Sequence, residues 1–311
     1  MSRKCLIVDP MHPSLFQLLA EIGWEPVYRP EVNADEIEQM ARGCEGMIIR
    51  SKAIVNGELL GDNPTIRFVA RAGAGMDNLD LKYLSSKNIT VIHAAEGNRD
   101  AVAEFAVGLL ISLLRNIPKA NQEVAGFVWD REGNRGEEIM GKTIGIIGYG
   151  NMGRAFANRL TGFGCKVLAY DKYKSRFGDN FCREATMEDI YLESDVLSLH
   201  IPLTEETRLM VNSEYLKRFA KNIILVNTAR GEIVSLRDLA EAVKNGKVRG
   251  AALDVLENEK INRLSPDQLE SFKYLTGRTN VILTPHIAGW TFESHEKINV
   301  ALVTKLKRLG F

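Results

Sequence analysis

The fold of this chain is indicated most directly by one stretch of sequence, Thr143-Ile144-Gly145-Ile146-Ile147-Gly148-Tyr149-Gly150-Asn151-Met152-Gly153. Its first five residues are the largely apolar run of a buried strand, and a helical pattern follows from Met152. Between them, Gly148 permits a tight turn, Gly150 lets the backbone approach a pyrophosphate, and Gly153 lets helix and strand pack closely. Strand, glycine pattern and helix in succession predict a dinucleotide-binding unit with the phosphates at the helix N-terminus.

A second predicted strand, residues 166–171, ends in Asp171, 18 positions after Gly153. A carboxylate at this place accepts hydrogen bonds from the ribose hydroxyls and repels the 2′-phosphate of NADP, so the pattern predicts NAD as the cofactor. Lys172 and Lys174 leave some use of NADP open, because either could approach a 2′-phosphate.

Short β-type runs alternate with helical stretches along the whole chain, which is the pattern of an α/β protein with parallel sheets. We expect strands at 4–9, 24–28, 46–50, 67–71, 90–93, 143–148, 166–171, 196–201, 223–228, 250–255 and 280–285. Helices are expected at 14–22, 34–42, from about Asp100 to Leu114, and at 152–161, 213–219, 236–244 and 292–309. Asn98 and Asp100 are the expected N-caps of the helix to Leu114, and residues 125–140 are expected to form an exposed loop. The fold class predicted is two doubly wound parallel-sheet units, Rossmann-like or flavodoxin-like, with a crevice between them. Their boundaries are predicted as 1–97 plus 290–311, and 98–289.

The composition excludes several classes of protein. Among 311 residues, 40 Lys and Arg balance 40 Asp and Glu, so the formal charge is zero, whereas general binders of nucleic acid or anionic membrane carry a basic excess. No stretch approaches the roughly 20 apolar residues that span a bilayer. Four cysteines without CxxC spacing, and only five histidines, predict reduced thiols, no metal site and a cytoplasmic location.

Three further motifs lie at the ends of predicted strands, where ligands of open α/β sheets bind. They are Asn227-Thr228-Ala229-Arg230-Gly231, the segment 252–259, and Thr284-Pro285-His286-Ile287-Ala288-Gly289. With the glycine fingerprint, the segment 71–78, Gly141-Lys142-Thr143 and His200-Ile201-Pro202-Leu203-Thr204, they resemble the D-2-hydroxyacid dehydrogenase family over nearly the whole chain.

The resemblance implies a catalytic set of Arg230, Glu259 and His286. The chemistry asks for such a set as well: a histidine can exchange the hydroxyl proton, a neighbouring carboxylate can orient its ring, and an arginine can bind the substrate carboxylate. In the family a proline commonly follows the catalytic glutamate, but Lys260 stands here. The assignment to Glu259 instead of Glu257 therefore depends on its five-residue offset from Asp254.

Cofactor contacts follow by position from the same resemblance. The amides of Asn151 and Met152 are expected at the pyrophosphate, Asp171 at the ribose, and His200 and Pro202 on the adenine–ribose side. The nicotinamide side is expected to be lined by Thr228, Arg230, Asp254, Ala288 and Gly289.

The residues that select the substrate are predicted in the first unit. The resemblance implies that this unit is the substrate-binding domain and that the second unit is the NAD-binding domain. The turn at Ala74 and Gly75 resembles the family's carboxylate-binding turn. Arg50 and Arg71 resemble residues near the substrate phosphate in D-3-phosphoglycerate dehydrogenases, and the chain is most similar to members without a regulatory domain. Arg131 lies in a Trp-x-Arg element that in some members reaches the site from a neighbouring subunit. The expected reaction is oxidation of 3-phosphoglycerate to 3-phosphohydroxypyruvate with NAD, in serine biosynthesis.

Two alternatives remain. One is a general 2-hydroxyacid dehydrogenase or a hydroxypyruvate/glyoxylate reductase, and the other is an NADH-sensing binding protein of the corepressor type. The expected partner is a small anionic 2-hydroxy or 2-keto acid. The strongly apolar helix 101–114 and the loop 125–140 predict a homodimer formed through the cofactor domain.

Overall fold

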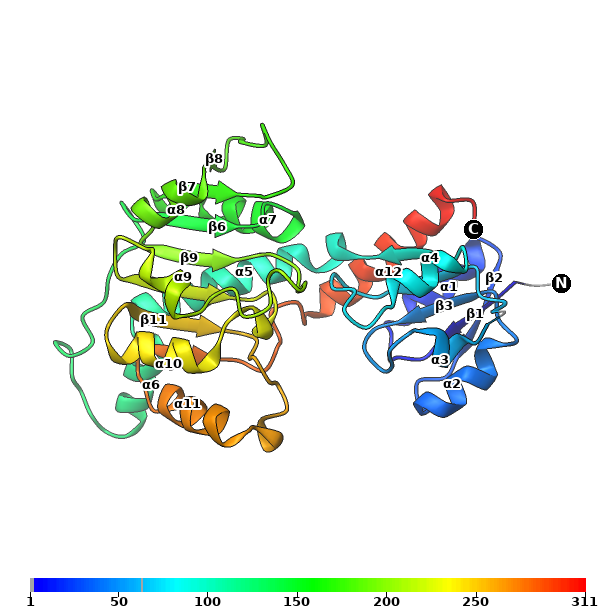
Figure 1. Ribbon diagram of the computed structural model, residues 1–311, viewed down its shortest axis with the longest axis horizontal. Helices are drawn as coiled ribbons and strands as arrows, with labels where there is room; N and C mark the ends of the chain where they lie inside the picture. Colours follow the sequence, from blue (N-terminus) through cyan, green and yellow to red (C-terminus); the bar gives the residue numbers. More distant parts are fainter. Residues whose placement is uncertain (1–2, 63) are drawn as a thin grey trace. The chain divides into compact units, whose positions relative to one another are not determined.

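A computed structural model describes residues 3–62 and 64–311, and the chain divides into two compact units (Figure 1). Unit 1 combines the chain up to Asp100 with the C-terminal segment Trp290–Phe311. Unit 2 is the continuous segment Ala101–Gly289. Each unit is built on one parallel sheet with helices on both faces, so the predicted fold class is confirmed.

The sheet of unit 1 has the order β2-β1-β3-β4-β5. Its strands are β1 (Arg3–Ile7), β2 (Trp24–Tyr28), β3 (Gly46–Ile49), β4 (Phe68–Arg71) and β5 (Thr90–His93). Successive side chains point to opposite faces: Cys5 and Ile7 pack with α1 (Ser14–Glu21) and α12 (Phe292–Arg308), and Leu6 packs on the other face. That other face is covered by α2 (Ala34–Ala41), α3 (Gly57–Leu60) and α4 (Leu81–Ser86). This is the flavodoxin-like order, in which the strand order reverses between β1 and β3.

The sheet of unit 2 has the order β12-β11-β10-β9-β6-β7-β8. Its strands are β6 (Thr143–Ile147), β7 (Lys166–Tyr170), β8 (Arg183–Glu184), β9 (Val196–Leu199), β10 (Ile223–Asn227), β11 (Val248–Leu253) and β12 (Val281–Leu283). One face is covered by α5 (Ala95–Leu114) and α7 (Asn151–Leu160). The other face carries α8 (Met187–Glu193), α9 (Ser213–Lys217), α10 (Leu236–Lys244) and α11 (Pro266–Thr276). Here the strand order reverses between β6 and β9, as in dinucleotide-binding folds.

The predicted strands and most predicted helices agree with the structure to within two residues at each end. The start of α5 is the main correction. The helix begins at Ala95, so Asn98 and Asp100 lie inside it and are not N-caps. The first turns of α5 are polar, so they show no apolar helical period in the sequence. They are ordered by packing on α12: a methyl group at Gly97 would lie 2.5 Å from the Ile298 Cα. This apposition is possible only because residue 97 has no side chain.

Several elements were missed by the sequence patterns. They are α3, α4, α6 (Ile117–Ala125), α8, α11, the short strand β8 and three 3-10 turns at 161–163, 231–233 and 261–263. Helix α11 lies in the polar segment after Lys260 and buries only Ser271 and Leu275, which is too little for a clear helical period. Within the described chain no single helix has the length and apolarity to cross a membrane; α5 and α6 reach them only as a pair bent by 62°.

Candidate active site

The loop between β6 and α7 has the geometry that its glycines predict. Gly148 has a φ of +92°, and a methyl group there would lie 2.5 Å from the His200 carbonyl oxygen. A methyl group at Gly153 would lie 2.0 Å from the Gly148 carbonyl oxygen, whereas Gly150 faces open space. No side chain caps α7 at Gly150, so the first amides of the helix, at Asn151 and Met152, are available to an anion.

Asp171 follows β7 beside this loop, and its carboxylate is already oriented. One oxygen accepts a hydrogen bond from the Tyr149 amide at 2.9 Å, and the other accepts one from the Tyr173 amide at 3.0 Å. Both neighbouring lysines are engaged elsewhere. Lys172 pairs with Glu206, and Lys174 donates to the Tyr149 carbonyl at 2.6 Å. Neither lysine therefore neutralises the negative charge of the Asp171 carboxylate.

His200 lies after β9, on the other side of the point where the strand order reverses. Its Nε2 is 2.8 Å from the Ser198 hydroxyl, and its ring packs on Phe156. Burial lowers the pKa of His200 to about 4, so the imidazole is neutral at physiological pH. Pro202 follows on an exposed segment. A neutral, packed ring suits a wall of a binding site better than a group that exchanges protons.

The turn that carries Arg230 is held by a buried amide. The Asn227 side chain, at the end of β10, accepts from the Ala229 amide at 3.0 Å and donates to the Arg230 carbonyl at 2.9 Å. A methyl group at Gly231 would lie 1.8 Å from the Leu256 carbonyl oxygen, so this turn packs closely on the next strand-end loop. The guanidinium of Arg230 is half-buried and donates to the Ala229 carbonyl at 2.6 Å.

A buried polar atom in the same turn is consistent with a cofactor. The hydroxyl of Thr228 has no hydrogen-bond partner among the described residues, although it is shielded from solvent. Buried polar groups are normally paired. This hydroxyl, the open face of Gly150 and the uncapped start of α7 fit a bound dinucleotide.

Asp254, at the end of β11, organises the loop that carries His286. Its side chain is 1% exposed, and its carboxylate accepts hydrogen bonds from the Thr284 hydroxyl (2.6 Å) and from the amides of Ile287 (2.9 Å) and Ala288 (2.7 Å). The Asp254 carbonyl also accepts from the His286 amide at 2.8 Å. His286 has a φ of +56°, an uncommon conformation for this residue, and these contacts hold it there.

Glu259, and not Glu257, faces the histidine. The Nδ1 atom of His286 is 2.9 Å from a carboxylate oxygen of Glu259, and both side chains are about half exposed. Glu257 points elsewhere: its carboxylate accepts from the Leu236 amide at 2.7 Å, at the start of α10, and from the Gln268 side chain at 3.1 Å. The structure thus brings together the histidine and the glutamate that the five-residue offset selects.

The unit 1 candidates lie where strands β3 and β4 end. Arg50 follows β3, its guanidinium is half-buried, and its amide donates to Asp9 at 2.7 Å. The Arg71 guanidinium folds over Gly73, where a methyl group would lie 1.6 Å from its Nη1. No group in the described chain accepts a hydrogen bond from the amides of Ala74 and Gly75.

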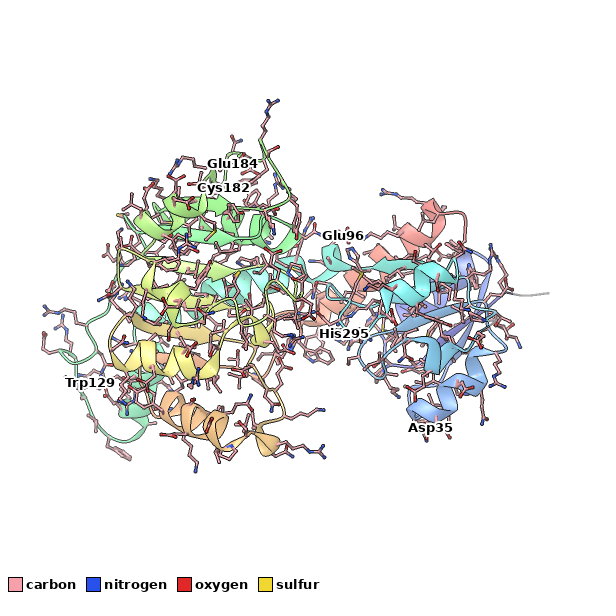
Figure 2. The ribbon with its side chains drawn as sticks, viewed as in Figure 1. Asp35, Glu96, Trp129, Cys182, Glu184 and His295 are labelled. Atoms are coloured by element: carbon pink, nitrogen blue, oxygen red, sulfur yellow. The ribbon has the colours of Figure 1, made fainter. Side chains whose placement is uncertain are left out.

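The Trp-x-Arg element lies apart from these groups, in the loop after α6. Trp129, which Figure 2 labels, is 86% exposed. Arg131 and most residues of this loop are exposed too. Within one chain, nothing in unit 2 packs on this segment tightly enough to bury it.

Comparison with known proteins shows the family to which the chain belongs. Residues 107–288 match the model of the D-isomer specific 2-hydroxyacid dehydrogenase NAD-binding domain. The chain is 34% identical to hydroxypyruvate reductase of Thermotoga maritima, over 97% of both chains. It is 31% identical to D-3-phosphoglycerate dehydrogenase of Methanocaldococcus jannaschii, and the match spans 98% of this chain but 57% of that protein. Among solved structures it resembles D-lactate dehydrogenase from Aquifex aeolicus, complexed with NAD and lactic acid, with a TM-score of 0.84 and 28% identity over 99% and 95% of the two chains.

The fold and the strand-end site thus define an NAD-dependent oxidoreductase. The chain belongs to the D-isomer specific 2-hydroxyacid dehydrogenase family, and NAD is its cofactor.

Sequence reasoning missed the residues that hold the site in shape. Asn227 carried a usable signal, because a polar residue ending a five-residue apolar strand needs partners when it is buried. Asp9, which follows β1 and binds the amides of Arg50 and Ser51, carried the same signal. Trp290 and His295 carried none, since their contacts to Arg50 join residues about 240 positions apart.

Proposed function

We propose that this dehydrogenase oxidises 3-phosphoglycerate to 3-phosphohydroxypyruvate with NAD, in the cytoplasm and as a step of serine biosynthesis. Unit 2 binds NAD, and unit 1 supplies the groups that select the substrate. The observation that carries the choice of substrate is Arg50: a half-buried guanidinium, at the carboxyl ends of the unit 1 strands, that forms no ion pair with a carboxylate of the described chain. Such a group fits an acid with a second anionic substituent.

The proposed chemistry uses His286 as the acid–base. With Nδ1 directed at Glu259, the other ring nitrogen is available to take the hydroxyl proton during oxidation and to return it during reduction. Glu259 orients the ring and stabilises its protonated form. When bound, NAD supplies the hydride acceptor at the substrate C2.

Arg230 is proposed to bind the substrate carboxylate and polarise the reacting oxygen with its fixed fork of donors. The amides of Ala74 and Gly75 are proposed to bind the same carboxylate, which their lack of acceptors within the described chain supports. Arg50 and Arg71 are proposed to bind the phosphate.

A specific observation favours a second candidate, hydroxypyruvate reduction. The relative named hydroxypyruvate reductase matches this chain over 97% of its own length, whereas the chain spans little more than half of the phosphoglycerate dehydrogenases it matches. The chemistry at C2 is the same for both substrates, so the difference lies in the groups that meet the substituent at C3.

A panel of substrates with both nicotinamide cofactors tests the proposal. We expect kcat/KM for 3-phosphoglycerate to exceed that for glycerate by at least tenfold with NAD, and NADP to be a poor substitute. Equal values for the two acids would contradict the choice of substrate, and activity restricted to hydroxypyruvate or glyoxylate would establish the second candidate.

The catalytic pair has a matched control in the same segment. His286→Asn and Glu259→Gln are expected to lower kcat by about 10²- to 10⁴-fold without loss of folding, because both side chains are half exposed. Glu257→Gln, two residues away and directed at α10, should keep most of the activity. Full activity of His286→Asn would remove this residue as the acid–base, and no turnover of any acid by the wild type would favour a binding protein that senses NADH.

We also propose a homodimer that is formed through unit 2. Helix α6 buries no residue, and the loop after it exposes Phe127 completely, with Val128 and Trp129 beside it. Such a contiguous apolar segment is typical of a protein interface. In the dimer, Arg131 is proposed to reach the substrate of the partner subunit. Light scattering at micromolar concentration tests this, and a monomer would refute it.

A further inference from the structure

We propose that Trp290 and His295 are positioning residues that fix the Arg50 guanidinium as a rigid receptor for a second anionic group on the substrate. The inference deepens the proposed function and rests on it. It makes the contribution of Arg50 to substrate selectivity depend on Trp290 and His295, and not on the arginine alone.

The guanidinium of Arg50 is held on two sides. Its central carbon lies 4.6 Å from the centre of the Trp290 ring, a cation–π contact. Its Nη2 atom lies 3.4 Å from Nε2 of His295, on the first turns of α12 (Figure 2 marks this histidine). The two rings also support each other, with centres 4.6 Å apart and planes at 90°. An arginine braced in this way loses less side-chain entropy when it binds an anion.

The Arg50 guanidinium lies where open α/β sheets bind their ligands. Unit 1 reverses its strand order between β1 and β3, and Asp9 and Arg50 follow these two strands. Ligands of open α/β sheets bind at such points, outside the carboxyl ends of the strands. The Asp9 carboxylate accepts from the backbone amides of Arg50 and Ser51 and so fixes the strand end. Burial lowers the pKa of Arg50, and the charge of Asp9 opposes that shift.

Burial and nearby positive charges keep His295 able to accept a hydrogen bond. Burial, and next the charges of Arg50 and His12, lower the pKa of His295 below its ordinary value. On α12 itself, its neighbours Glu293 and Glu296 are exposed. A neutral ring presents Nε2 to Arg50 as an acceptor, whereas a protonated ring would present a second donor and repel the guanidinium.

The remaining guanidinium donors of Arg50 are then directed by the two rings instead of being free to rotate. The receptor is cationic and preorganised. It therefore strengthens the binding of acids that carry a second negative charge, and it adds little to the binding of acids whose second substituent is neutral. Arg50 itself is partly exposed, so a small anion from solution can reach it.

The experiment compares Trp290→Ala, Trp290→Phe and His295→Ala with the wild type. The matched control is Phe292→Ala, an apolar ring two residues away that is 95% exposed. For each protein, kcat and KM are measured with 3-phosphoglycerate and with glycerate, and the binding of inorganic phosphate is measured by calorimetry. The ratio of the two kcat/KM values is expected to fall about tenfold in Trp290→Ala and His295→Ala, mainly through KM for the phosphorylated acid. Trp290→Phe, which retains a π face, should recover most of the ratio, and Phe292→Ala should leave it unchanged.

The outcomes separate this inference from the proposed function. If the wild type does not oxidise 3-phosphoglycerate but binds inorganic phosphate, and Trp290→Ala abolishes that binding, the receptor stands and the proposed substrate fails. If the wild type prefers 3-phosphoglycerate and Trp290→Ala and His295→Ala keep both that ratio and phosphate binding, the substrate stands and the positioning role is refuted. An equal fall for both acids in Trp290→Ala would also refute it, since that result indicates a general structural role.

Discussion

Replacement of Asp254 by Asn tests how the loop that carries His286 is held. The Asp254 carboxylate accepts three hydrogen bonds from residues 284–288, one from a hydroxyl that can rotate and two from backbone amides that cannot. An asparagine offers one oxygen and one NH₂ group. In either orientation of the amide, its NH₂ group faces the N–H of Ile287 or that of Ala288, and this backbone donor is left buried and unpaired.

The magnitude follows from that count. One unsatisfied buried donor costs about 1–3 kcal/mol. For a unit of this size, a loss of about 2 kcal/mol lowers Tm by roughly 4–8 °C. The same loss loosens the turn that holds His286, the proposed acid–base, at its φ of +56°. A displacement of about 1 Å in a reacting group costs on the order of 100-fold in rate.

The assay combines thermal unfolding, steady-state kinetics and the Kd for NADH. Asp195→Asn is the matched control: Asp195 accepts from the Thr143 amide at 2.8 Å and pairs with Lys221, at the amino end of β9 and away from the site. Both variants should lose stability, but only Asp254→Asn should lose about 100-fold in kcat. An unchanged kcat in Asp254→Asn would refute the positioning role, and a large rise in the Kd for NADH with little change in kcat would indicate a direct contact with the nicotinamide.

Three further predictions follow from single contacts. Asp171→Ser should lower the kcat/KM preference for NAD over NADP by about ten- to 100-fold, which corresponds to the loss of one charge-assisted hydrogen bond. No shift would show that Asp171 does not select the cofactor. Gly231→Ala should yield little folded or active protein, because its methyl group would lie 1.8 Å from the Leu256 carbonyl oxygen, and a normal Tm would contradict the close packing of the two strand-end loops. Acid should lower the stability of unit 1 through Glu96. Burial raises the pKa of this carboxyl, but the hydrogen bond and the charge of Lys305 outweigh burial and hold the pKa below its usual range. Its contribution to stability is therefore present above the unfolded pKa and is lost as the pH falls through the lower folded pKa, so Glu96→Gln should flatten the acid limb of the stability curve.

Much of the fold could be predicted because the information is local. Residues 143–153 combine a strand, a turn that only glycines allow and a helix start, and each of these is determined by neighbours in sequence. The same holds for α10, whose apolar positions recur at helical spacing and whose predicted bounds, 236–244, match the structure. Helix α11 shows the limit: with two buried side chains, its period is too weak to detect.

The candidate site divides in the same way. Arg230, Glu259 and His286 could be predicted as candidates because each lies in a strand-end motif that resembles the family's. That Glu257 is committed to α10 while Glu259 meets His286 depends on the path of the chain between β11 and α11, which the sequence does not encode locally.

The sequence by itself determined most of the strands and the place of the glycine turn, because these follow from side-chain period and backbone freedom. Only the tertiary structure decided where α5 begins, since Gly97 is ordered by its contact with α12. It alone also joined Arg50 to Trp290 and His295. Contacts between residues hundreds of positions apart depend on how helices pack on a sheet, and no pattern within a single segment records that packing.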